Sequence, residues 1–505
     1  MKFKHLFTAL ILSMSIASHA QSIKEKYLDS IFTKAYNDFE TTGLSITIVK
    51  GDKIVLNKSY GYKDYSKVDK VDENTVFNIA SCSKAFIAAA LGKLVDDDKL
   101  RWNDKVIKYL PDFELSDPYI TKEIDIKDIL DHRSGLATFE GDILWYCTDY
   151  SDEQIIEKLR YYPIKKNFRS DVGYSNVMYI VAGEIIKKIT GLTWEEYIRN
   201  EIFIPLEMDN SYTSIAELDK IKNIAYPHVN GKKPEVYEMR QLTAGSIFST
   251  THDLSNWMIM LLNNGEFKGK QILSKKTVNE LFASQVALNP PGNMKELGTH
   301  FYSYCLGWNS YDMFGKKIVE HEGGYPGYEA IVSLVPEDKI GIYVLCNDFN
   351  FSSDIFFVLK QMFLESYYGI ESRDWITDYV KEKKASEIEL QEYFNTPHIN
   401  KIEGTKPSLK LSEYCGIFKD KIYGKAEISM VNGELKLVLL PTKDKFNSTL
   451  EHWHYDTFRF KFKEEFLPYG FITFDFDSQG KVIGFKIDLP SDDINFKDLK
   501  FKKMR

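Results

Sequence analysis

The 505-residue sequence lacks the features that mark several common classes of protein. It has five cysteines, an odd and widely spaced set, with no C-x-x-C pair and no close Cys/His cluster. A disulfide-built scaffold and a structural zinc site are therefore not expected. No block of basic residues offsets the formal net charge of −8, which argues against nucleic acid as a partner. The cysteines are expected to be small buried residues: Cys82, Cys147, Cys305, Cys346 and Cys415.

Long apolar runs are also missing, except at the N-terminus. Lys2 and Lys4 precede an apolar stretch from Leu6 to Ile16, and Ser18-His19-Ala20 places small residues at both cleavage-site positions. Residues 1–20 therefore predict a signal peptide and an exported protein, periplasmic or secreted. The alternative is a buried helix or membrane anchor, but the stretch is short for a spanning helix, which needs about 20 apolar residues. No cysteine follows the cleavage site, so no lipid anchor is expected.

The sequence contains enough apolar residues to form a sizeable hydrophobic core. The sequence is 44% hydrophobic and 14% aromatic, which excludes wholesale disorder, and its length predicts two or three domains. The hydrophobic patterns predict helices at 25–40, 83–97, 177–190, 251–264 and 355–368, and hairpins at 44–62 and 328–345. This order indicates that residues 21–370 form a mixed α/β domain, in which an antiparallel sheet is flanked by helices.

The pattern changes after residue 370. Residues 371–407 predict a polar helix with a charge run at 381–384, followed by a linker with two prolines. From residue 408 to residue 505, short apolar strands alternate with turn signals, which is typical of a small antiparallel β-barrel. Trp453 in this region is either a surface contact residue or ordinary strand packing, and packing is the favoured interpretation.

Ser81 and Lys84 form an S-x-x-K tetrad at the start of the Ala-rich helix. Positions i and i+3 share a helix face, so the lysine amine can lie beside the serine hydroxyl and accept its proton. The tetrad alone is weak support, because a serine there can simply cap the helix and because residues 478–481 match the same pattern in a turn. Cys82 is a possible rival nucleophile, but it should project away from Lys84.

Two further elements follow in order along the chain. Tyr174-Ser175-Asn176 stands just before the helix at 177, where a neighbouring ammonium could stabilise a tyrosine phenolate that acts as general base. His321-Glu322-Gly323-Gly324 precedes the second hairpin, and its glycines would let a substrate lie against a strand edge. Neither element is specific alone: residues 393–395 also match Y-x-N, and a single histidine is more often structural.

Taken together, these elements resemble the serine β-lactamase and penicillin-binding-protein superfamily. The resemblance covers about residues 25–370 and is nearest to class C β-lactamases, D-Ala-D-Ala carboxypeptidases, D-aminopeptidases and related esterases. Flanking blocks agree with it: residues 77–80, 100–104, 109–111, 126–136 and 245–253. The C-terminal part resembles the lipocalin-like barrel that is often fused to these hydrolases.

The resemblance implies roles for single residues. Ser81 would be the acylated nucleophile, and Lys84 and Tyr174 the proton-transfer pair, with the base in each step left open. Asn176 would bind the substrate amide and the lysine. The backbone N–H groups of Ser81 and Gly324 would form the oxyanion hole. The remaining residues belong to the triad that in β-lactamases reads K-T-G: His321, Glu322 and Gly323.

This triad departs from the β-lactamase pattern. A histidine is mostly neutral at pH 7, whereas the lysine it replaces is a fixed cation that binds carboxylates. Glu322 adds negative charge and could favour a substrate amine, or could point away. The departure favours an exported hydrolase acting on esters, or on amides of D-amino acids or cell-wall peptides. The alternative is a penicillin-binding protein or β-lactamase with slow or no turnover. The substrate would be a small molecule or peptide, the chemistry requires no cofactor or metal, and the oligomeric state stays open.

Overall fold

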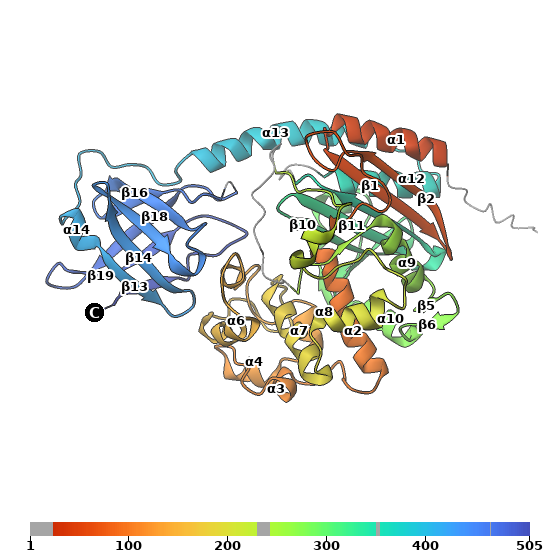
Figure 1. The fold of residues 1–505 in the computed structure, drawn as a ribbon, viewed down its shortest axis with the longest axis horizontal. Helices are drawn as coiled ribbons and strands as arrows, with labels where there is room; N and C mark the ends of the chain where they lie inside the picture. The colour runs from red at the N-terminus through yellow and green to blue at the C-terminus, as the bar shows by residue number, and fades with distance from the viewer. Residues whose placement is uncertain (1–23, 230–242, 350–353, 465, 505) are drawn as a thin grey trace, which may run out of the picture.

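An eight-stranded antiparallel sheet forms the centre of the larger domain (Figure 1). The computed structural model describes residues 24–229, 243–349, 354–464 and 466–504; the predicted signal peptide lies outside them. The strands lie in the order β2 (Lys53–Gly61), β1 (Gly43–Lys50), β12 (Ile340–Cys346), β11 (Tyr328–Val335), β10 (Lys316–Tyr325), β9 (Asn309–Met313), β8 (Tyr302–Tyr304) and β7 (Val286–Leu288). The mixed α/β architecture expected from the sequence is confirmed.

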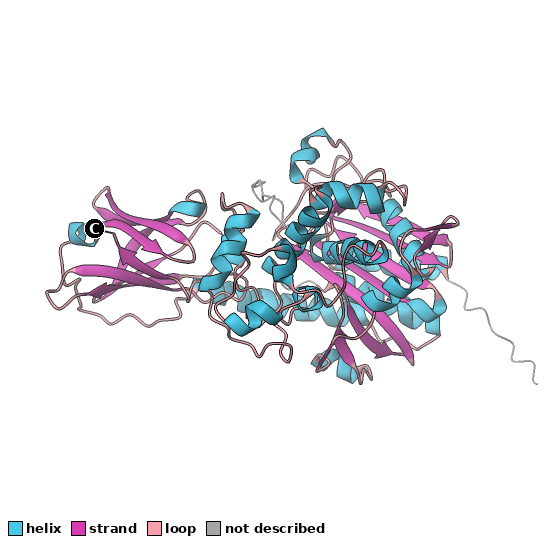
Figure 2. Cartoon of the chain, turned by 90° about the horizontal axis from the view of Figure 1, so that it is seen from below, coloured by secondary structure: helices cyan, strands magenta, loops and turns pink. Residues whose placement is uncertain are grey.

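Helices cover both faces of this sheet (Figure 2). Helices α1 and α12 pack on one face, while α9 and α2 lie on the other. The helices are α1 (Glu25–Asp38), α2 (Ser83–Asp96), α3 (Val106–Tyr109), α4 (Pro118–Glu123), α5 (Ile126–Leu130), α6 (Asp152–Lys158), α7 (Val177–Thr190), α8 (Trp194–Ile198), α9 (Thr251–Leu262), α10 (Lys275–Leu281), α11 (Gly292–Glu296), α12 (Ile355–Tyr368), α13 (Trp375–Asn395) and α14 (Leu411–Tyr414). No helix among the described residues has the length and apolar character needed to cross a bilayer.

Strand β10 is the main element that the sequence pattern missed. Four successive residues of β10, from Ile318 to His321, are buried, so the strand shows no alternation of apolar and polar residues. Its pairing with β9 ends at Glu320, whereas its pairing with β11 continues to Tyr325. The last five residues of β10, His321–Tyr325, therefore have one edge that no other described strand covers.

The C-terminal region is a closed eight-stranded barrel, as predicted (Figure 1). Its strands are β13 (Gly416–Asp420), β14 (Gly424–Val431), β15 (Glu434–Leu439), β16 (Asn447–His454), β17 (Thr457–Phe460), β18 (Gly470–Phe476), β19 (Val482–Asp488) and β20 (Lys500–Lys503). Phenylalanine rings fill the interior: Phe485 lies 4.6 Å from Phe501, and 4.8 Å from Phe418, between ring centroids. A barrel of eight strands is just wide enough for side chains to fill, and here they do.

Helix α13 connects the two domains, and both its last turn and the chain after it are hydrogen-bonded to the barrel. The Tyr393 hydroxyl donates to the Pro490 carbonyl oxygen (2.6 Å), and Trp453 Nε1 donates to the Ile399 carbonyl oxygen (3.1 Å). Trp453 is buried, so it packs against the linker and does not form a surface contact. Of the cysteines, Cys82, Cys305 and Cys346 are buried as expected, but Cys147 and Cys415 are only half-buried. None of the five forms a disulfide bond.

Candidate active site

The S-x-x-K residues meet at the beginning of α2. The Lys84 amine donates a hydrogen bond of 2.9 Å to the Ser81 hydroxyl and one of 3.2 Å to the Ala244 carbonyl oxygen. Ser81 lies in a 3₁₀ turn, Ala80–Cys82, and no side chain caps α2. The interpretation of Ser81 as a helix cap is therefore wrong, and its hydroxyl stays available to Lys84.

Lys84 is completely buried and forms no ion pair with any described carboxylate. Burial lowers the pKa of its amine to about 7, and the nearby Asp142 opposes this shift. A buried ammonium loses hydration that only a close counter-charge could replace. At neutral pH a large fraction of the amine is therefore unprotonated, as a proton acceptor must be.

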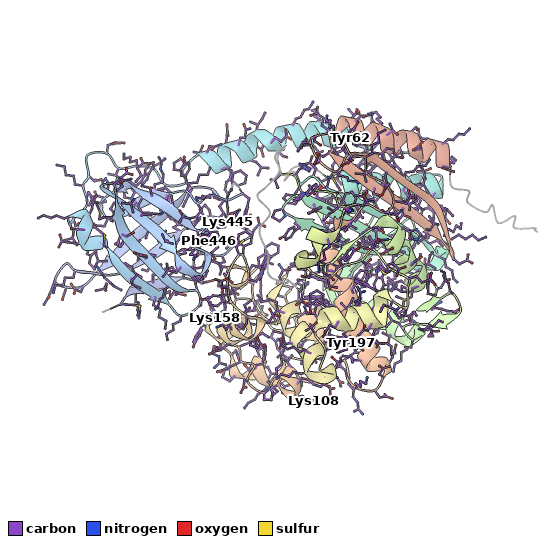
Figure 3. All side chains as sticks on the ribbon, in the orientation of Figure 1. Tyr62, Lys108, Lys158, Tyr197, Lys445 and Phe446 are labelled. Atoms are coloured by element: carbon purple, nitrogen blue, oxygen red, sulfur yellow. The ribbon has the colours of Figure 1, made fainter. Side chains whose placement is uncertain are left out.

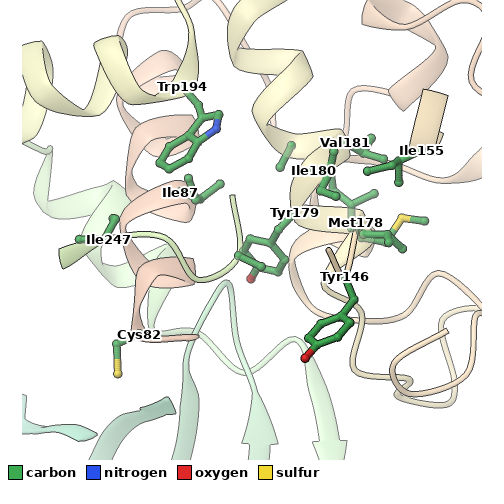
Figure 4. Packing of buried hydrophobic residues seen from close by; sticks show 14 of the residues in the cluster. Cys82, Ile87, Tyr146, Ile155, Met178, Tyr179, Ile180, Val181, Trp194 and Ile247 are labelled. Carbon is green, nitrogen blue, oxygen red and sulfur yellow. The ribbon is translucent and has the colours of Figure 1, made fainter. Parts of the chain in front are cut away.

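The backbone around the nucleophile is held in an uncommon conformation. Ala80 has a φ of 46°, in the left-handed region that costs an L-residue about 1–2 kcal/mol. The Asn78 side chain secures it by accepting the Ala80 N–H at 2.6 Å. The Cys82 side chain points toward the strands of the sheet (Figure 4), and its thiol lies 3.3 Å from the His321 carbonyl oxygen. Burial raises the pKa of this thiol to about 12, which makes Cys82 a poor nucleophile.

Tyr174 contacts the same amine. The Lys84 Nζ lies over the Tyr174 ring, 4.6 Å from its centroid. Burial raises the pKa of the Tyr174 phenol, and the Ser81 hydroxyl only partly offsets this shift. The sequence-based expectation was a stabilised phenolate. The structure gives the opposite direction, because burial of the phenol disfavours its charged form.

The His132 ring packs against the Tyr174 ring. Its ring is fully buried, 4.3 Å from the Tyr174 ring, and its Nδ1 accepts the Ser175 backbone N–H at 3.1 Å. Burial and the Lys84 amine hold the pKa of His132 well below its usual range, so the ring is neutral. The sequence analysis included residues 126–136 among the blocks of the family resemblance but gave His132 no role. The packing of this turn against Tyr174 is non-local, and the motif itself gives no sign of it.

Asp142 is a site residue that the sequence did not indicate. It lies in the 3₁₀ turn Asp142–Leu144, and Oδ2 accepts the Asn176 side-chain amide at 2.7 Å. Burial raises the pKa of its carboxyl to about 7. The hydrogen bond to Asp142 fixes the Asn176 side chain, whose expected roles toward the substrate amide and Lys84 stay predictions. Asp142 thus interacts with two site residues: it accepts a hydrogen bond from Asn176, and its charge raises the pKa of Lys84.

The two glycines of β10 occupy different environments. A Cβ on Gly323 would lie 2.5 Å from the Ile79 carbonyl oxygen and 3.0 Å from the Ser81 nitrogen, so only glycine fits against the nucleophile turn. Gly324 is exposed at the uncovered edge of β10. This arrangement places the start of α2 beside the free strand edge, where the backbone N–H groups of Ser81 and Gly324 were expected to bind an oxyanion.

His321 is buried and hydrogen-bonded within the protein. Its Nδ1 lies 2.6 Å from the Glu322 carbonyl oxygen and therefore carries the proton, so Nε2 accepts from the Tyr304 hydroxyl at 3.0 Å. Burial lowers the pKa of the imidazole to about 3, which leaves it neutral. Glu322 follows on the opposite face of β10, so its side chain points away from Ser81. Neither side chain offers a charge to a ligand at Ser81.

The other matches to the short motifs lie elsewhere. Residues 478–481 form the turn between β18 and β19, and residues 393–395 end α13. In contrast, Ser81, Lys84, Tyr174 and Gly323 come together, with Asn176 connected through Asp142. The described residues contain no group of three or more His, Cys, Asp or Glu side chains that could hold a metal ion.

Comparison with known sequences gives a consistent result. A family model described as Beta-lactamase matches residues 28–356, and one described as a domain of unknown function, DUF3471, matches residues 400–503. The unguisins hydrolase ungD of Aspergillus violaceofuscus is 26% identical over 453 residues, 82% of this chain and 79% of the relative. Protein flp of Staphylococcus aureus (strain NCTC 8325 / PS 47) is 28% identical, over 64% of this chain and 63% of the relative.

Solved structures share the fold. The octameric penicillin-binding protein homologue from Pyrococcus abyssi is 21% identical with a TM-score of 0.59, and the match covers 95% of this chain and 99% of that one. The D-amino acid amidase from Ochrobactrum anthropi SV3, complexed with L-phenylalanine, is 21% identical with a TM-score of 0.54, over 72% of this chain and 99% of that one. With the Beta-lactamase model matching well over half of its residues, the chain belongs to the β-lactamase-fold hydrolase family.

Proposed function

We propose that the chain is a serine acyl hydrolase that cleaves neutral amides or esters, including amides of D-amino acids, through a Ser81 acyl-enzyme. The observation that carries the proposal is the Lys84 amine, fully buried, 2.9 Å from the Ser81 hydroxyl and with a pKa of about 7. A nucleophilic serine needs an adjacent base that is unprotonated at working pH, and this amine meets both conditions.

The reaction follows from these positions. The Ser81 oxygen bonds to the substrate carbonyl carbon while its proton passes to the neutral Lys84 amine. The backbone N–H groups of Ser81 and Gly324 bind the resulting oxyanion. When the bond to the leaving amine or alcohol breaks, that group takes up a proton through Lys84 and Tyr174. Water then attacks the acyl-enzyme, the acid product leaves, and Ser81 regains its proton.

The character of the His321 position supports a neutral substrate. A lysine there would attract a carboxylate, but this imidazole has a pKa of about 3 and donates its only N–H to the chain itself. An amide or ester next to it needs no counter-charge. The inclusion of D-amino acid amides agrees with one structural neighbour, which is called a D-amino acid amidase.

We also propose export to the periplasm or the medium. The support is the N-terminal sequence, in which Lys2 and Lys4 precede the apolar stretch from Leu6 to Ile16. Expression of the full-length gene product and N-terminal mass analysis tests this: a mature chain that begins at Gln21 is expected, and an intact Met1 in the exported fraction would contradict it.

Intact-mass spectrometry tests the catalytic proposal. The protein is mixed separately with an activated ester, a D-alanine amide and a penicillin. We expect a transient adduct with product accumulation for the ester and the amide. Ser81→Ala should abolish it, while Ser478→Ala, in the other S-x-x-K match, should behave as wild type. A stable penicillin adduct without turnover of the other two would favour a penicillin-binding protein instead, and identical behaviour of Ser81→Ala and wild type would overturn the proposal.

A further inference from the structure

The barrel contacts the larger domain at the loop that carries Asp142. Tyr146, four residues further on, is buried, and its ring stacks on Phe446 of the barrel with 5.9 Å between centroids and 21° between planes. Phe466, from another barrel loop, meets the same tyrosine ring edge-on at 5.8 Å. Figure 3 shows Lys445 and Phe446 on the side of the barrel that faces the larger domain. This tyrosine is thus enclosed by barrel aromatic residues.

Polar contacts at the same place fix the geometry. The Tyr146 hydroxyl donates to Glu464 at 3.1 Å, and Glu464 forms an ion pair with Lys445 in which both side chains are almost completely buried. The Thr442 hydroxyl donates to the Tyr146 carbonyl oxygen at 3.4 Å. A buried pair of this kind is costly to disrupt, because either partner alone would be an uncompensated charge. The contact is therefore specific in orientation.

Charges of the barrel act on groups of the larger domain next to this contact. Burial raises the pKa of the Asp142 carboxyl and of the Tyr325 phenol, and Asp493 and Glu464 of the barrel add smaller contributions in the same direction. Tyr325 directly follows Gly324 on the uncovered edge of β10. The barrel thus borders both the loop that anchors Asn176 and the end of the strand edge beside Ser81.

We infer that the barrel is a positioning part of the hydrolase site: Phe446 and Glu464 hold Tyr146, and through its loop they fix Asp142 and the side-chain amide of Asn176. This inference rests on the proposed function for its kinetic readout, because Asn176 is expected to bind the substrate amide. The filled barrel interior is consistent with such a role, since phenylalanine rings occupy the space where a barrel could bind a ligand.

Substrates with and without an amide separate positioning from general damage. Phe446→Leu keeps the barrel interior apolar but loses the stacked ring, and Tyr146→Leu removes the other side of the same contact. Each variant should lower kcat/KM for a D-amino-acid amide by about tenfold or more, because small displacements of a substrate-positioning group are costly. An activated acetate ester, which has no amide for Asn176, should lose less than about threefold. Tyr146→Phe keeps the ring and should fall between wild type and Tyr146→Leu.

Tyr393→Phe is the matched control. The Tyr393 hydroxyl donates to the Pro490 carbonyl oxygen of the barrel at 2.6 Å, but Tyr393 lies on α13, and none of its described contacts is with residues 138–150. This variant should leave the ratio of amide to ester activity unchanged. An equal loss on both substrates in the Tyr146 and Phe446 variants, or no change in the ratio, would overturn the inference.

Hydrogen exchange gives a readout that needs no turnover. In Phe446→Leu, amides of residues 138–150 should exchange at least about tenfold faster than in wild type, while those of α2 stay unchanged. Unchanged exchange in 138–150 would contradict the inference. If wild type turned over neither substrate, the proposed function would fail, and the exchange measurement would still decide whether the barrel holds this loop.

Discussion

Two lysines of the larger domain are both completely buried, yet their surroundings differ (Lys84 and Lys360). Lys360, on α12, forms an ion pair of 3.2 Å with Glu320 and donates to the Tyr311 hydroxyl at 3.2 Å. Lys84, on α2, has hydroxyl, carbonyl and aromatic neighbours. Lys360, with its ion pair, stabilises the packing of α12 on the sheet. Lys84 forms no ion pair with a described carboxylate, and its lowered pKa lets it exchange a proton near neutral pH. Burial alone therefore does not distinguish a structural lysine from a reactive one.

Strand β10 contributes one residue to the surroundings of each lysine, Glu320 to those of Lys360 and His321 to those of Lys84. Glu320 points to the α12 side, and its neighbour His321 points to the α2 side, because successive residues of a strand face opposite ways. Three experiments test the contrast between the two lysines and a fourth tests the Ser81 turn, and their expected effects decrease in the order given below.

Lys84→Met should lower kcat for an activated ester by about 10³–10⁴-fold, the usual contribution of a general base. The thermal midpoint at pH 6 should not fall, because the change removes a buried amine that is mostly protonated below pH 7 and forms no ion pair with a described carboxylate. Steady-state kinetics and a melting curve check both statements. A large loss of stability with modest loss of activity would show that Lys84 is structural.

Lys360→Met should do the reverse. It leaves Glu320 buried without its cation, which should reduce the free energy of unfolding by about 3–5 kcal/mol. Activity per folded molecule should stay within about threefold of wild type, since Lys360 lies on the far side of the sheet. Denaturant unfolding and active-site titration measure the two quantities. In the double variant Lys360→Met/Glu320→Leu, much of the lost stability should return.

The pH dependence of kcat/KM should report the Lys84 amine. Because its pKa is lowered to about 7 in the folded protein, activity should fall about tenfold per pH unit below 7 and level off above it. The sign follows from the base being active only when unprotonated. Lys360→Met should keep the same profile, while a flat profile between pH 5 and 8 would exclude Lys84 as the base.

Gly323→Ala should lower kcat by about tenfold or more, because its Cβ would lie 2.5 Å from the Ile79 carbonyl oxygen and push the Ser81 turn aside. Gly292→Ala is the control: its Cβ would meet nothing within 4 Å and its φ is not positive. Kinetics of the two variants on one ester give the comparison. Equal activities would mean that the turn tolerates the displacement.

The sequence predicted well those parts that depend on local pattern. The helix over 355–368 and the start of α2 at the S-x-x-K tetrad agree with the structure residue by residue. The predictions missed β10, because buried charges such as Glu320 replace the alternation that identifies a strand. Asp142 and Tyr146 were also missed, because their partners lie far along the chain, at Asn176 and in the barrel. Non-local partners of this kind leave no periodic signal.

The connection through α13 has a consequence for how strongly the barrel needs to bind. A helix of 21 residues spans about 30 Å and keeps the barrel within reach of the Tyr146 loop. Such a tether gives an effective concentration on the order of 1 mM, so an affinity equivalent to about 4 kcal/mol is enough to keep the contact half-formed. A barrel supplied as a separate chain at micromolar concentration would have to bind about a thousandfold more tightly to occupy the same place.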